Sequence, residues 1–258
     1  MPAAADISSD DVVGTVPWLL SATSDRIALY EECNLGSACA DSVRYAFNTD
    51  LAIVNGGDLT GNLPPGELTY EFFYEAIPDG LTLATTTVSI TQLKEILESA
   101  LSHVVMAADR SYDVELSKHG AFPQISGFTL AYDPSQPAGD RLVWLKVNGN
   151  AVDFNDLERS FTLAATENML SGGYEMPVVP EAESSDLTLR DTMEQYIRSG
   201  LDDYSRQPLQ PKRITVVGLK MNSEQMISIM LFLAVVCIII GLLYPFWRKR
   251  RRFLNRDY

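Results

Sequence analysis

The chain has 258 residues and a formal net charge of −14 at pH 7, and 46% of its residues are hydrophobic. This length and composition suit one globular domain with a well-buried core, and the acidic balance argues against a protein that binds nucleic-acid phosphates. The charge is unevenly spread: residues 248–258 carry six basic side chains against one aspartate, and the preceding part of the chain is strongly acidic.

Apolar patterns predict several strands and helices in the first part of the chain. Leu51–Asn55 is apolar up to its last residue and ends at two glycines, which is typical of a buried strand entering a tight turn. Ser89 and Gln92 form a potential capping box for a helix with leucine, isoleucine and alanine along one face. The other elements expected here are a strand over 12–20, a helix from Asn34 that ends before Asn48, a short helix over 70–76 and a strand over 81–90.

The second part of the chain continues this mixture. Phe122–Tyr132 and Leu142–Val147 are separated by a proline- and glycine-containing loop, so we expect a β-hairpin. Thr188 and Asp191 predict the capped start of a helix. Since strands and helices interleave irregularly, the expected fold class is α+β with a mixed α/β sheet. The remaining expected features are an N-terminal extension at 1–11, one domain over 12–220, strands over 161–165 and 214–219, and a glycine turn at 172–173.

A transmembrane helix is predicted near the C-terminus. Residues 226–247 carry no charge and are numerous enough to cross the hydrocarbon core of a bilayer as one helix. The positive-inside rule places the basic tail on the cytoplasmic or matrix side of the membrane, where it contacts lipid headgroups. The expected anchor begins at Met226, ends at Trp247, is followed by Arg248, Arg250 and the rest of the tail at 248–258, and is joined to the domain by a linker at 221–225.

Three sequence features bear on the compartment. Residues 1–20 show no signal peptide, and no asparagine stands in an N-x-Ser/Thr sequon. Cys33 and Cys39 enter a predicted helix six residues apart, a rise of about 9 Å that is too long for a disulfide. We therefore favour the mitochondrial inner membrane, with the domain in the intermembrane space, over the plasma membrane or a tail-anchored domain in the cytosol.

The order of several motifs resembles the C-terminal, nucleoside-binding domain of the 5'-nucleotidase family. The resemblance covers roughly residues 12–217 and implies the fold of that domain. The matching segments, in the family's order, are ECNLG at 32–36, LAIVNGG at 51–57, GELTYEFFYEAIPDG at 66–80, TQLKEILE at 91–98, FPQISGFTLAYD at 122–133, GDRLV at 139–143, AATENMLSGG at 164–173 and Arg213-Ile214.

The resemblance also implies a substrate pocket whose charged residues are replaced. The family's arginine before the first motif corresponds to Glu31, and the arginine of its N-G-G-x-x-Arg motif corresponds to Thr60. An arginine fork suits phosphate and ribose oxygens, whereas a glutamate repels phosphate.

The aromatic positions of the implied pocket are replaced as well. One stacking phenylalanine of the family aligns with Asp79 and the other with Met169 or Asn168, and the aspartate after the double glycine is Tyr174. Losing both rings removes stacking worth about 1–3 kcal/mol per base. The degenerate pocket implied by the resemblance comprises Asn55, Gly56, Gly57, Thr60, Asp79, Met169, Gly172 and Gly173.

We expect no catalytic residue, no cofactor and no metal site in this chain. In the family that it resembles, hydrolysis is performed by a separate N-terminal metallophosphatase domain with two metal ions. His103, at the end of an amphipathic helix, is expected to be a capping or surface residue, and His119 a loop residue.

The first hypothesis is therefore a membrane-anchored, non-catalytic domain that acts as a structural or accessory subunit of a membrane protein complex. Its partners are expected to be other subunits, through the transmembrane helix and the acidic domain, and the lipid bilayer, but not nucleic acid. One alternative is the nucleoside-binding half of a split or processed 5'-nucleotidase. Another is a binding module in which Glu31, Asp58, Thr60 and Asp79 favour a cationic, sugar-like or metal ligand, although we prefer to explain these positions as solvated acidic residues of an abandoned pocket.

Overall fold

The computed structural model describes residues 8–22, 24–109, 111–200 and 212–218. Contacts divide the chain into two units, Met1–Gly218 and Leu219–Tyr258, and the second unit lies wholly outside the described residues. The anchor from Met226 to Trp247, with Arg248, Arg250 and the 221–225 linker, therefore remains a prediction. Within the described part, no helix is both long enough and apolar enough to cross a membrane.

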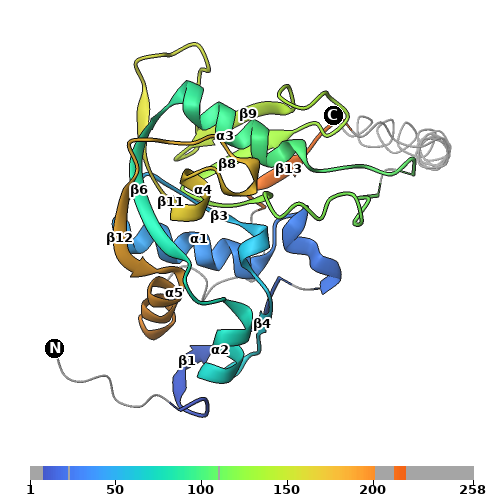
Figure 1. Ribbon diagram of the computed structural model, residues 1–258. Helices are drawn as coiled ribbons and strands as arrows, with labels where there is room; N and C mark the ends of the chain where they lie inside the picture. Colours follow the sequence, from blue (N-terminus) through green and yellow to red (C-terminus); the bar gives the residue numbers. More distant parts are fainter. Residues whose placement is uncertain (1–7, 23, 110, 201–211, 219–258) are drawn as a thin grey trace, which may run out of the picture. The chain divides into compact units, whose positions relative to one another are not determined.

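A five-stranded mixed sheet organises the first unit (Figure 1). β3 and β11 run parallel, with Leu51 opposite Leu163, and every other neighbouring pair in this sheet is antiparallel. This arrangement confirms the expected mixed sheet. In spatial order the strands are β12 (Glu183–Thr188), β6 (Thr82–Ser89), β11 (Ser160–Thr166), β3 (Leu51–Asn55) and β7 (Pro123–Ser126).

Helices cover both faces of this sheet. Alternate residues of a strand point to opposite faces, so Ala52 and Val54 of β3 enter one hydrophobic cluster and Leu51 and Ile53 enter another. The first cluster includes residues of α1 (Asn34–Phe47) and α5 (Leu189–Arg198), and the second includes residues of α3 (Ile90–Ser102), on the other side of the sheet in Figure 1. Burial on both faces explains why β3 is continuously apolar.

A second sheet contributes to the cluster that contains α3. β8 (Phe128–Tyr132) pairs antiparallel with β9 (Leu142–Val147), which confirms the predicted hairpin. β10 (Asn150–Ala151) and β13 (Ile214–Val216) flank this pair. The smaller elements are β1 (Val12–Val16) paired with β5 (Gly66–Thr69), β2 (Leu20–Ser21) paired with β4 (Asn62–Leu63), α2 (Tyr70–Ala76), α4 (Glu167–Leu170), and the 3₁₀ helices η1 (Ser24–Leu29), η2 (Gly56–Asp58) and η3 (Gly173–Glu175).

The prediction of one continuous strand over 122–132 was wrong. The chain breaks at Gly127, and the two halves join different sheets, as β7 and β8. Gly127 has φ +87°, and a Cβ there would lie 2.0 Å from the carbonyl oxygen of Asp50, so only glycine allows this close approach. The expected strand over 12–20 is likewise divided into β1 and β2, with Pro17 between them.

Cys33 and Cys39 are both free and buried. Burial raises the pKa of the Cys33 thiol to about 12, and it raises the pKa of Cys39 well above its ordinary value. Both thiols are therefore protonated at neutral pH and act as small apolar side chains. Cys33 also caps α1, since its Sγ accepts a hydrogen bond from the backbone N–H of Gly36.

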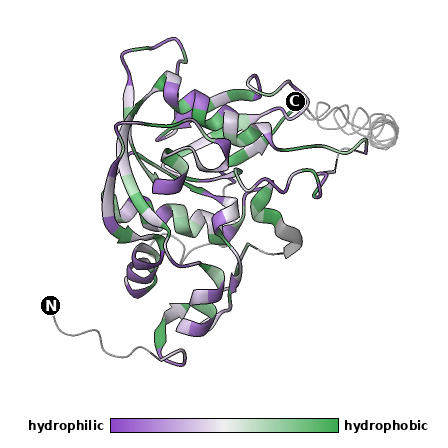
Figure 2. Cartoon of the chain, viewed as in Figure 1, coloured by the Kyte–Doolittle hydropathy of each residue, from purple (hydrophilic) through white to green (hydrophobic). Residues whose placement is uncertain are grey.

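Both predicted capping boxes are present. In α5, Thr188 Oγ1 accepts from the Asp191 N–H, and Asp191 Oδ2 accepts from the Thr188 N–H at 2.8 Å. The visible side of α5 is largely hydrophilic in Figure 2, whereas Leu189, Met193 and Ile197 are buried against the sheet.

Replacing Thr188 by alanine is expected to destabilise the domain by about 1 kcal/mol, because it leaves an amide at the start of α5 without its acceptor. Thermal unfolding of the full chain in detergent checks this, with an expected loss of roughly 2–4 °C. Ser160→Ala, at an exposed position in β11, is the control and should leave the midpoint in place. Equal effects of the two substitutions would contradict the role assigned to the cap.

Candidate functional site

The turn that follows β3 is built by two glycines. The Gly56 N–H donates to the carbonyl oxygen of Phe122 at 2.8 Å, and the Gly57 N–H donates to that of Gly120 at 2.9 Å. A Cβ on Gly56 would lie 1.7 Å from the carbonyl oxygen of Ala28. The glycines therefore let three backbone segments meet at one point, which is the structural reason for Asn55-Gly56-Gly57 at the end of this strand.

Tyr174 fills the space beside this turn. A Cβ on Gly57 would lie 2.9 Å from the Tyr174 ring, and one on Gly120 would lie 2.7 Å from it, so the ring packs directly on both glycines. Its hydroxyl donates to Asp58 Oδ1 at 2.9 Å. Tyr174 and Glu175 have φ values of 54° and 58°, which few residues other than glycine adopt. This left-handed backbone turns the ring of Tyr174 toward the glycine turn.

Asp58 is a buried acid with two side-chain hydrogen-bond donors. Besides the Tyr174 hydroxyl, Thr166 Oγ1 lies 3.4 Å from its Oδ2, and the residue is only 3% exposed. Burial raises the pKa of Asp58 to about 6, although both hydrogen bonds oppose the rise. The expectation that such acidic residues are solvated is therefore wrong for Asp58.

Asn55, at the end of β3, is completely buried. Neither the oxygen nor the nitrogen of its side-chain amide has a hydrogen-bond partner within the described ranges. Buried amides are normally satisfied, so this one calls for a water molecule or a ligand atom.

Helix α4 and the glycine-containing turn that follows it carry three further positions of the predicted pocket. Met169 is 1% exposed and packs in the hydrophobic cluster with α3, so its side chain is a core group. Gly172 has φ +99°, and a Cβ on Gly173 would lie 2.4 Å from the Asn168 side chain. Both glycines thus serve the turn that leads to Tyr174.

Thr60 and Asp79 have partners of their own. Thr60 Oγ1 donates to the carbonyl oxygen of Glu75 at 2.6 Å, which ties it to α2. Asp79 is exposed and lies 3.5 Å from the Arg190 guanidinium of α5. Glu31 likewise pairs with Lys212 at 2.9 Å. The replaced positions are each engaged locally, which weakens the hypothesis that they converge on a new cationic ligand.

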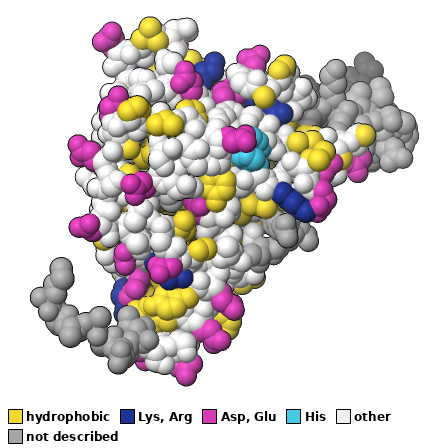
Figure 3. Space-filling view, in the orientation of Figure 1, with side chains coloured by type: hydrophobic (Ala, Val, Ile, Leu, Met, Phe, Trp, Pro, Cys, Tyr) yellow, Lys and Arg dark blue, Asp and Glu magenta, His cyan; other side chains and the backbone are white. Residues whose placement is uncertain are grey.

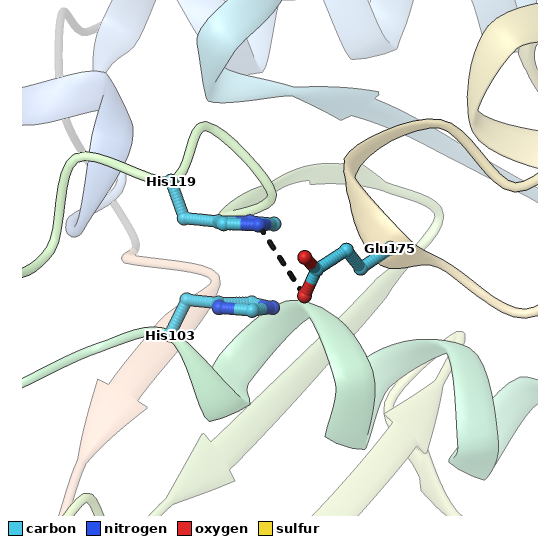
Figure 4. Close-up of side chains that lie close together, drawn as sticks. All are labelled: His103, His119 and Glu175. Atoms are coloured by element: carbon cyan, nitrogen blue, oxygen red, sulfur yellow. Dashed lines mark ion pairs between the residues drawn. The ribbon is translucent and has the colours of Figure 1, made fainter.

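The structure brings together three side chains that the sequence analysis did not connect: His103, His119 and Glu175 (Figure 4). The two imidazole rings are stacked, with centroids 3.4 Å apart and planes 4° apart. Glu175 Oε2 lies 3.7 Å from Nε2 of His119. Burial is the main cause that lowers the pKa of His103, and the neighbouring His119 lowers it further. Both effects favour the neutral form of His103. His103 does cap the C-terminus of α3, as expected, and His119 lies in a turn.

The mixed sheet, the glycine turn and the helices on both faces define a nucleotidase-type C-terminal domain. The chain belongs to the 5'-nucleotidase, C-terminal domain family, whose model matches residues 12–181. This confirms the resemblance inferred from the ordered motifs.

Individual relatives agree with this assignment. The chain is 28% identical over 159 residues to the trifunctional nucleotide phosphoesterase protein YfkN of Bacillus subtilis, covering 59% of this chain and 10% of that protein. It is 34% identical over 104 residues to a probable 5'-nucleotidase of Treponema pallidum, covering 40% of this chain and 16% of that protein.

Solved structures show the same fold. A 5'-nucleotidase precursor from Thermus thermophilus superimposes with a TM-score of 0.66 at 24% identity, over 81% of this chain and 40% of that one. The NAD nucleotidase of Haemophilus influenzae gives a TM-score of 0.57 at 19% identity. The match covers 81% of this chain and 39% of that one. The chain therefore spans about two fifths of these structures and a smaller share of the curated relatives.

Proposed function

We propose that this chain is a membrane-anchored member of the family that does not hydrolyse nucleotides itself and serves as a structural or accessory subunit of a membrane complex. The anchor is the apolar stretch 226–247, and the partners are other subunits that contact this helix and the acidic domain. The proposed membrane is the mitochondrial inner membrane, with the domain in the intermembrane space. The reduced, buried Cys33 and Cys39 are compatible with that placement.

The observation that carries this proposal is the position of Tyr174. Its ring packs on Gly57 and Gly120, and its hydroxyl is held by the buried Asp58. A ligand that approached this turn would have to displace the ring and break that hydrogen bond. The replacements at Glu31, Thr60 and Asp79, each engaged with a neighbouring residue, support the same proposal.

The proposal is tested by the native mass of the protein after gentle detergent extraction from its own membrane. Native electrophoresis followed by mass spectrometry of the band should place the chain in a large assembly of constant composition. Migration as a monomer or dimer would contradict the accessory role. Copurification with a metal-dependent phosphatase active on AMP would instead support the alternative of a split or processed 5'-nucleotidase.

Retained nucleoside binding is the second candidate function, and Asn55 favours it. An amide that is buried and unpaired within the described part of the chain suits a small polar ligand. In this case Tyr174 would act as a removable cover, and its left-handed backbone would be the point at which the loop rearranges.

Calorimetry with adenosine separates the two functions. Under the first proposal, the dissociation constant for adenosine is above about 1 mM for both the wild-type full chain and Tyr174→Ala. Such weak binding is expected because residues of the pocket are replaced. Tyr174→Phe is the matched control, because it keeps the ring and removes only the hydroxyl. Micromolar binding by the alanine variant, with much weaker binding by wild type and the phenylalanine variant, would establish the covered pocket instead.

A further inference from the structure

The stacked histidines and Glu175 form a cluster that the family's pocket does not use. His103 ends α3, His119 lies in the turn before β7, and Glu175 ends η3, so three separate elements deliver the donors. One ligand atom from each residue can be chosen so that all three lie within 4.8 Å of one another. A cyan histidine patch with an adjoining acidic group is visible at the surface in Figure 3, so an ion can reach the cluster from solvent.

We propose that His103, His119 and Glu175 bind a divalent transition-metal ion of the zinc class. Two imidazoles and one carboxylate are the protein ligands of open tetrahedral zinc sites, in which water takes the fourth position. With bonds of about 2.0–2.1 Å, neighbouring ligand atoms of such a site lie about 3.4 Å apart. The 3.7 Å between His119 Nε2 and Glu175 Oε2 is close to that spacing, and the stacked rings place the His103 nitrogens beside those of His119.

The bonding of the two rings leaves them available to an ion. Within the described residues, Nδ1 of His119 is buried and has no hydrogen-bond partner, so no protein group fixes which ring nitrogen carries the proton, and Nε2, which faces Glu175, can present its lone pair to an ion. The two parallel rings point their lone pairs in parallel directions, so binding requires the rings to splay apart. Glu175 has a side chain that is 77% exposed and is free to swing toward them.

Contacts outside the cluster hold together the three chain segments that carry its side chains. Ser99 Oγ, on α3, donates to the carbonyl oxygen of Glu175 at 3.1 Å, so the helix that ends in His103 also holds the loop that carries Glu175. The ring of Tyr174 packs on Gly120, the neighbour of His119. Two of the three ligands are therefore tethered through Tyr174, which makes the cluster a property of this fold and not of a chance surface contact.

The test uses the full chain, untagged, in detergent, with zinc chloride as the probe. The chain has only two histidines, so labelling histidine with ¹⁵N gives four ring-nitrogen signals that can all be followed by NMR. With zinc in roughly tenfold excess, we expect one nitrogen of each ring to shift to the position of a metal-bound nitrogen. Absence of a shift in either ring overturns the proposal.

Affinity measured by competition with a chelator gives the second readout. We expect His103→Gln and His119→Gln each to raise the dissociation constant for zinc by more than about 100-fold, and Glu175→Gln to raise it by about tenfold or more. Glu158→Gln, at an exposed position elsewhere, is the matched control and should leave the affinity unchanged. Thermal unfolding with chelator present verifies that each variant is folded, and unchanged zinc affinity in a folded His103→Gln protein overturns the three-ligand site.

Discussion

Replacing Asp58 by asparagine is expected to stabilise the domain by up to about 3 kcal/mol at neutral pH, although Asp58 makes two hydrogen bonds. Its folded-state pKa is raised to about 6 from 3.8, mainly by burial. Asparagine retains an oxygen that accepts from the Tyr174 hydroxyl, and it carries no charge to be desolvated. The substitution therefore removes the cost of the buried anion and keeps the bond to Tyr174.

The direction of the pH dependence of stability follows from proton binding to Asp58. Between about pH 4 and pH 6 the folded protein keeps a proton on Asp58 that the unfolded chain has lost. The stability contributed by Asp58 therefore falls as pH rises through this range and is constant above it. The advantage of the asparagine variant should accordingly be largest above pH 6 and vanish below about pH 4.

The measurement is a set of unfolding midpoints for wild type and Asp58→Asn between pH 4 and pH 8. A gain of up to roughly 6–12 °C is expected at neutral pH, from about 2–4 °C per kcal/mol for a domain of this size. Asp156→Asn, at an exposed position, is the control for the general effect of removing a carboxylate. A destabilised Asp58→Asn protein, or a gain that does not depend on pH, would show that burial is not the main influence on Asp58.

Elements that depend on local sequence could be predicted well. The bounds of α1, α2 and β3 and both capping boxes agree with the sequence patterns, because apolar periodicity and capping act over only a few residues. The prediction of one continuous strand over 122–132 was wrong because the break depends on the close approach of Gly127 to Asp50. No local sequence pattern encodes this tertiary contact.

The candidate sites were harder to predict for the same reason. Tyr174 and Asp58 are 116 positions apart, and the resemblance showed that Tyr174 replaces an aspartate but not that its ring packs on the glycine turn. His103, His119 and Glu175 have no motif spacing, so only the fold reveals their proximity. The presence of just two histidines was the one available signal, and it suggested two isolated residues.

The glycines of the β3 turn are family-motif residues that contact protein backbone. Gly56 belongs to the predicted pocket, yet its contacts are with protein backbone: Phe122 through its N–H, and Ala28 through the space where a Cβ would be. The Ala28 carbonyl oxygen also accepts from Nε2 of the buried Gln124 at 3.2 Å. Gly56 is thus required by packing whether or not any ligand binds.

Gly56→Ala is accordingly expected to destabilise the domain by at least about 3 kcal/mol, at the upper end for an overpacked site. The added Cβ would lie 1.7 Å from the Ala28 carbonyl oxygen, so backbone must move and the hydrogen bond from Gln124 is disturbed. Thermal unfolding of the full chain should show a midpoint lowered by roughly 6–12 °C, or no folded protein.

Gly139→Ala is the matched control for this experiment. Gly139 has φ +89° with no other atom within 4 Å of a Cβ built on it, so alanine there meets backbone strain without a clash and costs about 1–2 kcal/mol. If Gly56→Ala loses more stability than Gly139→Ala, the difference measures the cost of moving the β3 turn away from η1, which contains Ala28. If the two variants lose equal stability, close packing is not what requires glycine at position 56, and its place in the motif would then have to be explained by a ligand.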